Sequence, residues 1–486
     1  MNLASALITH AMSRPDHPAI EQGNVITSYA QAVEIIGRLA AVLGEQGIKK
    51  GNRVGLCLSD TSAHLLLHYA VAWLGATIVP IDFRWKATEK VAVVKAFGCK
   101  IVLIEADDET APLMPSLVFD PNWQNEERPV PAPVDEANLP IVLSLSSGTT
   151  GSPTGAMVTH EQLYERFISQ WVGMGFNSSD RYLLATPLYF GGGRSFAMSM
   201  LAAGATVLVR ATDQRDEIIA IVNERDITAL FLVPTQLGRL LDAWDGNGIA
   251  MPSVRCLVTS GAAIQPDDRR RVIERLTPNL TDYYATSEGG GIAVLLPHEQ
   301  LTFPDTVGRP AFRVEIQVVD DEDRPLRAGE VGRLRYRGPG VSTQLVDGQG
   351  RSTTAEEGGW FSPGDLAQIT PRGHVRLVGR IKDVVIRGGV NIYPVEVESV
   401  LSGHPEVVEV CVFGMPDRDL GEVVAAAVVK RAGATCSEDD LRAHVKERLA
   451  SYKTPKLITF VEALPRNPSG KVVRTALKAL LGVPDA

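Results

Sequence analysis

The chain of 486 residues is too long for one ordinary hydrophobic core, so we expect a large domain, or two subdomains, together with a smaller one. Hydrophobic residues make up 45% and charged residues 22%, as in ordinary soluble globular proteins. The formal net charge of -9 implies no broad basic surface, which argues against nucleic acid as the main partner.

Cysteine usage and hydropathy favour a cytoplasmic protein. The five cysteines lie far apart and form no CxxC pair or metal-ligand spacing: Cys57, Cys99, Cys256, Cys411 and Cys436. Reduced, mostly buried thiols are therefore expected. The N-terminus has no basic n-region, so no signal peptide is expected. The longest apolar stretch, 65–76, contains His68 and is too short to span a bilayer.

Short apolar runs alternate with longer amphipathic stretches over the first half of the chain. Strands are predicted at 54–58, 76–81, 100–105, 141–145, 205–210, 229–233 and 256–259. Helices are predicted at 62–74 and 88–97, with Gly98 closing the second. This alternation indicates an α/β fold of parallel-rich sheets covered by helices. The proline-rich segment 121–140 is predicted to be a surface connection.

The pattern changes from about residue 312. Segments 314–319 and 332–337 are predicted strands joined by Gly/Pro turns, without helices between them, which indicates a small antiparallel barrel or sheet. Beyond Lys382, helices are predicted at 395–401 and 438–449, and strands at 407–413 and 423–430. About a hundred residues suffice for a small α+β domain.

A loop of small and hydroxyl-bearing residues follows the predicted strand 141–145. It runs through Ser146, Ser147, Gly148, Thr149, Thr150 and Gly151. Small residues let backbone N–H groups approach phosphate oxygens closely, and a threonine hydroxyl can also reach a phosphate-bound Mg²⁺. No Gly-Lys-Ser/Thr sequence ends this loop, so it is not a Walker loop. By itself, such a composition is more typical of a turn or linker.

Five further segments follow in a fixed order: SGAAI at 260–264, YATSE at 284–288, WFSPGDL at 360–366, GRIKD to GGVNIYP at 379–394, and PRNPSGK at 465–471. The ordered set resembles the adenylate-forming superfamily of acyl-CoA synthetases, adenylation domains and beetle luciferases. The resemblance runs nearly end to end, and includes GATIVP at 75–80 and YKTPK at 452–456. It implies ATP, Mg²⁺ and coenzyme A as ligands.

Three residues carry catalytic roles by this resemblance. Glu288 and Thr149 are the expected Mg²⁺ ligands, and a carboxylate oxygen suits this hard cation. Lys471 is expected to stabilise charge that builds up between the carboxylate and the α-phosphate. Taken singly, Glu288 would be a surface carboxylate and Lys471 a solvated lysine near the C-terminus.

The resemblance also implies a nucleotide site. Its residues are Ser146, Ser147, Gly148, Thr149, Thr150, Gly151, Gly261, Ala262, Ala263, Tyr284, Ala285, Thr286, Ser287, Asp365, Arg380 and Lys471. Asp365 would accept the ribose hydroxyls, Arg380 would contact ribose or phosphate oxygens, and Tyr284 would stack on adenine. Each of these has an ordinary alternative: an Asx turn, an ion pair and a core tyrosine.

The family alternates between two orientations of its C-terminal domain. By resemblance we expect an N-terminal adenylate-forming domain at 1–381, with a β-rich subdomain at about 312–381. A mobile C-terminal domain would follow at 382–486, with Lys382 as the hinge. Gly388 and Gly389 would line the channel for the coenzyme A thiol, where bulk would block passage. A plain tight turn is the alternative for these glycines.

The chain departs from the family pattern at four positions. Thr154 replaces a lysine that would meet the phosphates, Phe190 replaces a histidine that gates the acyl pocket, Ala285 replaces a glycine, and Ser287 replaces a threonine. The expected acyl pocket comprises Phe190, Gly191, Gly192, Ala285, Gly289 and Gly290, with the glycines making space. Arg194 could meet a second carboxylate, but as an arginine at a helix N-terminus it is expected to face solvent.

The implied activity is that of an ATP-dependent acid–CoA ligase acting on a hydrophobic fatty or aromatic monoacid. It would form acyl-AMP and release pyrophosphate, and then form the thioester and release AMP. Two alternatives stay open: an adenylating ligase that loads an acyl carrier protein, and a degenerate ATP- or acyl-binding protein, which only Thr154 favours. No nucleic acid or membrane span is expected, and a homodimer stays open.

Overall fold

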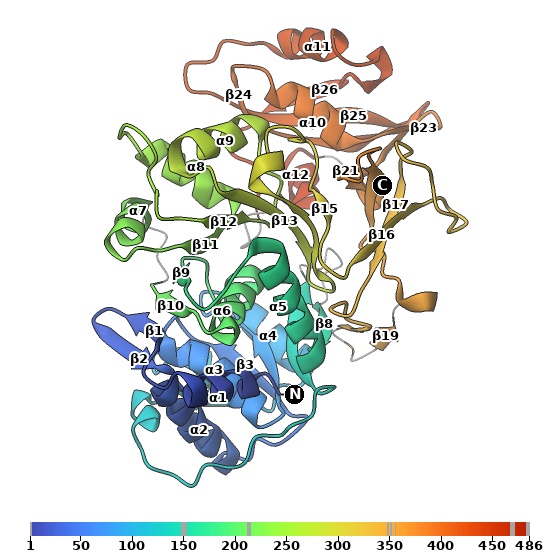
Figure 1. The fold of residues 1–486 in the computed structure, drawn as a ribbon. Coiled ribbons are helices and arrows are strands. Elements are labelled where there is room, and N and C mark those ends of the chain that lie inside the picture. Colours follow the sequence, from blue (N-terminus) through green and yellow to red (C-terminus); the bar gives the residue numbers. More distant parts are fainter. Residues whose placement is uncertain are drawn as a thin grey trace. The chain divides into compact units, whose positions relative to one another are not determined.

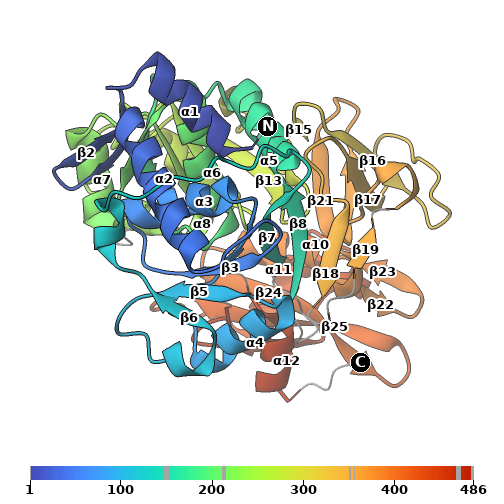
Figure 2. The ribbon, with the colours of Figure 1, turned by 90° about the horizontal axis from the view of Figure 1, so that it is seen from below.

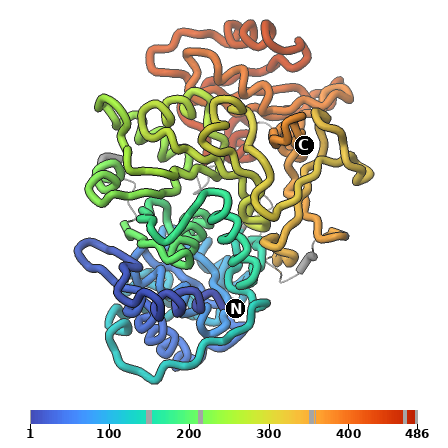
Figure 3. The backbone as a smooth tube through the Cα atoms, in the orientation of Figure 1, coloured from blue at the N-terminus to red at the C-terminus, as the bar shows by residue number. Residues whose placement is uncertain are grey.

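The computed structural model describes residues 2–146, 153–210, 215–347, 349, 352–354, 356–466 and 472–482. Two compact units divide the chain. The larger unit comprises Met1–Ile316 with Tyr336–Phe361, and the smaller unit comprises Gln317–Arg335 with Ser362–Ala486. Figure 3 follows the backbone of the larger unit from its blue N-terminal helices into its green strands.

A nine-stranded sheet forms one half of the larger unit. Its strands lie in the order β15 (Arg309–Pro310), β14 (Gly290–Leu295), β13 (Leu280–Thr286), β12 (Cys256–Thr259), β11 (Ala229–Leu232), β9 (Arg181–Leu184), β10 (Thr206–Val209), β1 (Pro18–Gln22) and β2 (Val25–Ser28). The pairs from β1 through β13 are parallel, whereas β2, β14 and β15 add antiparallel edges.

An eight-stranded sheet forms the other half of this unit. Its order is β19 (Ser352–Thr354), β18 (Gln344–Asp347), β8 (Thr154–Thr159), β7 (Pro140–Ser146), β4 (Thr77–Pro80), β3 (Arg53–Cys57), β5 (Ile101–Ile104) and β6 (Ser116–Val118). The strands from β7 to β6 are parallel. Strand β8 was not predicted from the sequence, and it pairs antiparallel with both β7 and β18.

Nine helices of the larger unit are described: α1 (Ala4–Ser13), α2 (Tyr29–Glu45), α3 (Ser62–Trp73), α4 (Ala87–Phe97), α5 (His160–Met174), α6 (Gly191–Ala203), α7 (Arg215–Glu224), α8 (Pro234–Ala243) and α9 (Pro266–Arg271). Local signals explain several of their ends. Thr159 and Gln162 form a capping box at the start of α5. Gly98 ends α4 in the left-handed conformation, with φ 58°.

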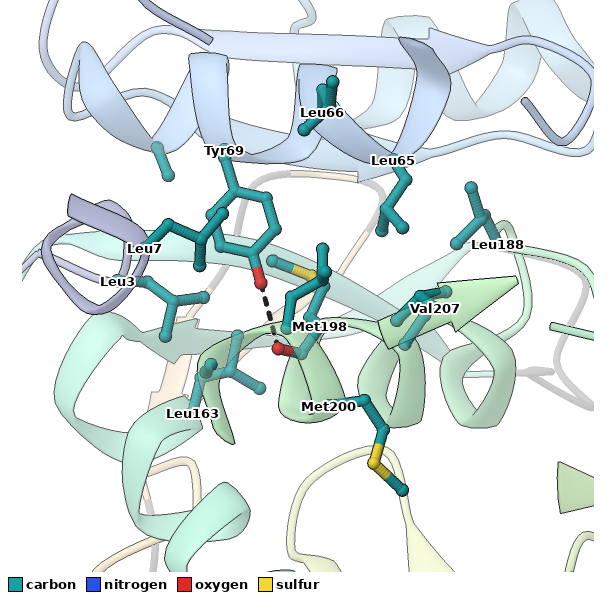
Figure 4. Close-up of a cluster of buried hydrophobic side chains, with 14 of the residues drawn as sticks. Leu3, Leu7, Leu65, Leu66, Tyr69, Leu163, Leu188, Met198, Met200 and Val207 are labelled. Carbon is teal, nitrogen blue, oxygen red and sulfur yellow. Dashed lines mark hydrogen bonds between the residues drawn. The ribbon is translucent and has the colours of Figure 1, made fainter. Parts of the chain in front are cut away.

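Helix α3 connects the two sheets of the larger unit. Its residues Ala63 through Trp73 are all buried, as expected for a helix that is apolar on every side. It contacts β4 in one sheet and β1 in the other. Figure 4 shows Leu65 and Tyr69 of α3 pointing toward α6, with Tyr69 donating a hydrogen bond of 2.9 Å to the Met198 carbonyl. Figure 1 shows α1, α2 and α3 grouped at one end of the unit.

The predicted elements of this region are confirmed, with ends that shift by one or two residues. Helix α4 packs on the eight-stranded sheet through Val93, Val94 and Phe97, beside β5 and β6 (Figure 2). All five cysteines are buried and have free thiols. No helix among the described residues has the length and apolar character needed to cross a membrane.

The smaller unit contains two sheets. In one, β16 (Glu315–Val319), β17 (Gly332–Arg337), β20 (Asp365–Ile369) and β21 (Val375–Arg380) lie in that order. The small barrel that we expected is therefore wrong: these strands form an open sheet with edges at β16 and β21. A closed barrel would need those two strands to pair, and no such pair occurs among the described residues.

The second sheet is built around a long hairpin. Its strands are β23 (Val390–Ile392), β22 (Val385–Arg387), β25 (Gly421–Lys430), β24 (Val407–Asp417) and β26 (Leu457–Phe460), with β26 parallel to β25. Helices α10 (Pro394–Ser402), α11 (Glu438–Lys446) and α12 (Arg474–Leu480) accompany it. Val397, Leu401 and Leu441 of α10 and α11 join its buried core. The predicted α+β character of this segment is confirmed.

A buried hydrogen bond links the loops that follow one strand of each large sheet. Asp60 follows β3, and its Oδ1 accepts a hydrogen bond of 2.8 Å from the backbone N–H of Leu188, which follows β9. Burial is the main cause that raises the pKa of Asp60 from 3.8 to about 6, and the hydrogen bond from Leu188 opposes it.

Because the folded-state pKa of Asp60 is raised, this group lowers the free energy of unfolding as pH rises from about 4 to about 6. Asp60→Asn keeps the acceptor and removes the charge. We expect the variant to be more stable than the wild type above pH 6, by about 1–3 kcal/mol, and to lose that advantage below about pH 4. Unfolding free energies across this pH range measure the effect.

The exposed Asp16 supplies the control for removal of a charge, as Asp16→Asn. A difference between Asp60→Asn and the wild type that is the same at every pH would contradict the raised pKa.

Candidate functional site

Strands β7 and β8 form a hairpin around the predicted phosphate loop. Leu145 pairs with Gly155, and Ser146 pairs with Thr154. The loop residues Ser147, Gly148, Thr149, Thr150 and Gly151 lie outside the described residues. Thr154 also pairs with Asp347 of β18, so it occupies a central strand and not a surface loop.

The segment with Glu288 lies at the turn between β13 and β14. Ser287 Oγ donates a hydrogen bond of 3.2 Å to the carbonyl of Leu145. This bond joins the end of β13 in one sheet to the end of β7 in the other. It therefore places Glu288 next to the start of the phosphate loop.

Further contacts hold the backbone around Glu288. Thr286 Oγ1 shares a hydrogen bond of 2.6 Å with Tyr336 Oη and accepts one of 2.9 Å from the Gly289 N–H. The Ser342 N–H donates to the Glu288 carbonyl at 2.8 Å. Among the described residues, no hydrogen bond or ion pair involves the Glu288 carboxylate. This half-buried carboxylate is therefore open to a ligand, and its chemistry fits Mg²⁺.

Several predicted site residues follow the carboxyl ends of neighbouring parallel strands. Gly261, Ala262 and Ala263 come after β12, and Tyr284 and Ala285 lie near the end of β13. The carboxyl edge of a parallel sheet is where ligands bind in α/β folds. Gly261 has a φ of +93°, which favours glycine, so a tight turn does occur there.

Phe190 begins a stack of aromatic side chains at the same edge. Its ring lies 6.3 Å from that of Phe231 with an interplanar angle of 19°, and Phe231 lies 5.1 Å from Phe196 at 20°. Phe196 meets Tyr283 at 5.6 Å, edge to face. A Cβ added at Gly261 would lie 3.7 Å from the Phe190 ring. The stack therefore extends from the Gly261 turn to β13.

The glycines expected to make space around the acyl group differ in their surroundings. A Cβ at Gly192 would lie 2.6 Å from the Phe231 ring, and one at Gly289 would lie 2.3 Å from Ile292. At Gly290, with φ +68°, a Cβ would lie 2.6 Å from Arg166. Only Gly191 of this set has open space around it. Protein side chains therefore fill most of the space that these glycines leave.

The prediction that Arg194 faces solvent is wrong. Only 5% of this residue is exposed, and Nη1 donates to the carbonyls of Leu188 and Tyr189, both at 3.2 Å. Burial lowers its pKa to about 10. The physical reason is the close approach at the start of α6, where a Cβ at Gly193 would lie 2.2 Å from the Thr186 carbonyl. Because Gly193 packs so closely against this carbonyl, the next residue, Arg194, lies in the interior.

In the smaller unit, Asp365 and Arg380 are brought together. They face each other on β20 and β21, and Arg380 Nε lies 2.9 Å from Asp365 Oδ1. The Asp365 side chain is 8% exposed and that of Arg380 is 49% exposed. The Arg380 guanidinium therefore fixes the orientation of the buried Asp365 carboxylate. A carboxylate that accepts hydrogen bonds from two ribose hydroxyls would need such a fixed orientation.

Lys382, Gly388 and Gly389 follow Asp365 and Arg380 in the sequence. Lys382 is in a short 3₁₀ turn, Ile381–Asp383, directly after β21. Burial lowers its pKa from the ordinary value. Gly388 and Gly389, with φ +56° and +82°, form the turn between β22 and β23. A tight hairpin turn by itself accounts for both glycines.

The segment that contains Lys471 is flanked by paired residues. Arg466 and Val472 form an antiparallel bridge, whereas Lys471 itself lies outside the described residues. Arg474 starts α12 and contacts Asp383 at 3.1 Å and Glu398 at 2.7 Å. These ion pairs connect α12 with α10 and with the turn that holds Lys382.

Residues that the sequence did not indicate also take part. Arg166, Tyr336 and Asp60 contact the backbone or side chains of the predicted motifs. Polar or charged residues flank each of them in the sequence, and no local spacing marks any of them as part of the site.

The chain was compared with known protein families and proteins. Residues 7–345 match the model of the AMP-binding enzyme family, and residues 396–471 match that of the AMP-binding enzyme C-terminal domain. A feruloyl-CoA synthase from Amycolatopsis sp is 29% identical over 489 residues, covering 99% of both chains. A long-chain-fatty-acid–CoA ligase from Mycobacterium tuberculosis is 30% identical over 473 residues, covering 94% of this chain and 93% of the relative.

Solved structures agree with these matches. ATP-bound MatB from Rhodopseudomonas palustris has a TM-score of 0.89 at 27% identity, covering 99% of this chain and 98% of that one. The amide bond synthetase McbA from Marinactinospora thermotolerans has a TM-score of 0.88 at 26% identity, covering 98% and 99%. The chain therefore belongs to the AMP-binding enzyme family, as an AMP-forming acyl-CoA ligase that uses ATP, Mg²⁺ and coenzyme A.

Proposed function

We propose that this ligase activates a hydrophobic monocarboxylic acid, and that it prefers aromatic acids to long aliphatic ones. The observation that carries the preference is the stack of Phe190, Phe231 and Phe196, which ends at the Gly261 turn. An aromatic face attracts a flat aromatic substrate by stacking, beyond the gain from burial alone. The feruloyl-CoA synthase relative, whose acyl group is aromatic, supports this preference.

The chemistry is proposed to follow two half-reactions. The carboxylate attacks the α-phosphorus of ATP, and pyrophosphate leaves. The thiol of coenzyme A then loses its proton to solvent and attacks the acyl carbonyl, and AMP leaves. No side-chain nucleophile is needed, so positioning and stabilisation of charge account for the rate.

We assign each of the predicted site residues a role in this chemistry. Thr149 and Glu288 hold Mg²⁺, which supplies positive charge to the phosphate oxygens. The loop 146–151 binds the phosphates through backbone N–H groups, and Gly261 to Ala263 lie against adenine with Tyr284 to Ser287. Asp365, oriented by Arg380, accepts the ribose hydroxyls. Lys471 stabilises the developing charge. The open carboxylate of Glu288 and the Asp365–Arg380 pair support these assignments.

We also propose that the C-terminal segment alternates between two orientations, one for each half-reaction. Lys382 is the proposed hinge of residues 382–486, against an N-terminal part at 1–381, and Gly388 and Gly389 line the thiol channel. Its position in a short turn directly after β21 supports a hinge role for Lys382.

An acid panel tests the function. Benzoate, cinnamate, hydroxycinnamates, hexanoate and palmitate are each assayed with ATP and free coenzyme A, by AMP formation and thiol consumption. We expect the highest kcat/KM with an aromatic acid. A preference for palmitate would contradict the proposal. Adenylation without consumption of free thiol would instead indicate an acyl carrier protein as acceptor.

Phe190→Ala tests the aromatic stack. Loss of the ring should raise KM for the best aromatic acid by about 2–10-fold, since a stacking contact contributes roughly 0.5–1.5 kcal/mol. Longer aliphatic acids should improve relative to aromatic ones. Phe190→Tyr, which keeps the ring, is the matched control. Equal specificity of the Ala and Tyr variants across the panel would show that the ring does not select the acid.

Lys471→Ala tests the first half-reaction. We expect pyrophosphate release to fall by about 10²–10³-fold, because one charged contact to the transition state is lost. Thioester formation from supplied acyl-AMP should change little. Wild-type pyrophosphate release in this variant would rule out the role of Lys471.

Gly389→Leu tests the second half-reaction. The leucine side chain would fill the proposed channel, so acyl-AMP should accumulate while thioester formation stops. Gly389→Ala is the matched control, because a single methyl group carries the strain of a backbone with φ +82° without the bulk that would fill a channel. If both variants lose the same activity, strain in the turn is the cause and the channel assignment fails.

A further inference from the structure

Arg166 is a buried cation on α5. It is 8% exposed, and burial lowers its pKa to about 10. Among the described residues, no acidic side chain forms an ion pair with it. Removing a guanidinium from water without a carboxylate partner is costly, so other contacts must offset this cost.

Three backbone carbonyls supply those contacts. Arg166 Nε donates to Gly340 at 2.8 Å, Nη1 donates to Ser287 at 3.3 Å, and Nη2 donates to Glu288 at short range. The guanidinium thus bridges the Ser287–Glu288 turn and the 340–342 segment. Hydrogen bonds from a charged donor are stronger than neutral ones, and the planar fork of arginine fixes their direction.

Neighbouring residues reinforce the same two segments. Gln162, one turn earlier on α5, donates to the Val341 carbonyl at 2.8 Å. The Ser342 N–H donates to the Glu288 carbonyl at 2.8 Å. Helix α5 therefore anchors the 340–342 segment, which in turn supports the backbone of Glu288.

Two glycines leave room for the stem of this arginine. A Cβ at Gly290 would lie 2.6 Å from Arg166 Cδ, and one at Gly340 would lie 3.0 Å from Cγ. The Arg166 side chain thus fits between the segments of Gly290 and Gly340. An apolar side chain could fill the same space, and it would not carry the cost of removing a charge from water. Filling space alone does not explain an arginine at this position.

We propose that Arg166 is a positioning residue, which orients the backbone at Ser287 and Glu288 so that the Glu288 carboxylate faces the Mg²⁺ of the bound nucleotide. This inference rests on the proposed role of Glu288. Its physical basis is that the carboxylate has no hydrogen bond or ion pair among the described residues, so it depends on the backbone for its position, and the nearby Arg166 charge attracts it as well. Ser287 also carries the bond to Leu145, so the same contacts hold Glu288 near the end of β7.

The test compares Arg166→Met with Arg166→Lys in the full chain. Mn²⁺ binding is measured by electron paramagnetic resonance in the presence of a non-hydrolysable ATP analogue, and pyrophosphate release is titrated with Mg²⁺. For Arg166→Met we expect about tenfold weaker Mn²⁺ binding, a matching rise in the Mg²⁺ requirement and a lower kcat. Arg166→Lys, which keeps a charged donor, should fall between this variant and the wild type.

A second readout separates positioning from general damage. Thioester formation from supplied acyl-AMP needs no Mg²⁺-bound ATP, so it should stay near the wild-type rate in Arg166→Met. Arg255→Met is the matched control: Arg255 binds Asp180 and the Gly175 carbonyl elsewhere in the larger unit. It should lower the melting temperature without changing the Mg²⁺ requirement. If Arg166→Met does not fold, Arg166→Gln replaces it.

Glu288→Gln distinguishes the two levels of the proposal. If Glu288→Gln binds Mn²⁺ like the wild type, Glu288 is not a metal ligand. The proposed function is then wrong at this residue, whatever the result for Arg166. If Glu288→Gln is impaired but Arg166→Met binds Mn²⁺ normally, Glu288 keeps its role and the positioning inference is overturned. Equal loss of both half-reactions in Arg166→Met would also overturn it.

Discussion

The hydrogen bond from Ser287 Oγ to the Leu145 carbonyl joins the two sheets of the larger unit where their strands end. The proposed site, with phosphates at one sheet and the Glu288 carboxylate at the other, needs a fixed distance between the two sheets. Helix α3 fixes the sheets from inside, since it is buried along its length and contacts both. Asp60 adds a link between the loops after β3 and β9. The geometry of the site thus depends on how rigidly the sheets are joined.

Most of the architecture follows from local pattern. Short apolar runs became β3, β4, β5, β11 and β12, because strands buried on both faces need no polar alternation. Asp365 and Arg380, which come from two separate motifs, form an ion pair with each other, and the sequence did not predict that contact. Strand β8 was missed because small and polar residues begin it, and the antiparallel hairpin it makes has no two-residue turn signal.

The less predictable part of the site consists of buried polar residues. Arg194 was expected in solvent, and only the close packing of Gly193 against the Thr186 carbonyl shows why it is buried. Arg166 and Tyr336 contact the Glu288 segment from positions more than forty residues away in sequence, Arg166 by 122 and Tyr336 by 50 from its partner Thr286. Tertiary contacts of this kind leave no periodic signal in a single sequence.

Phe190 stands where the family pattern has a histidine, and the physical properties of the two side chains differ. A histidine ring carries two nitrogens that can donate or accept hydrogen bonds, so water can satisfy it when its rotamer changes. Phe190 instead stacks on Phe231, which stacks on Phe196 in turn. Moving the ring would break a stacking contact and expose apolar surface that is now covered. Gly192 is then required, because a Cβ there would lie 2.6 Å from the Phe231 ring. In our proposal, Phe190 is therefore a fixed wall of the acyl pocket and not a mobile gate, and the acid is selected by the shape of an aromatic surface.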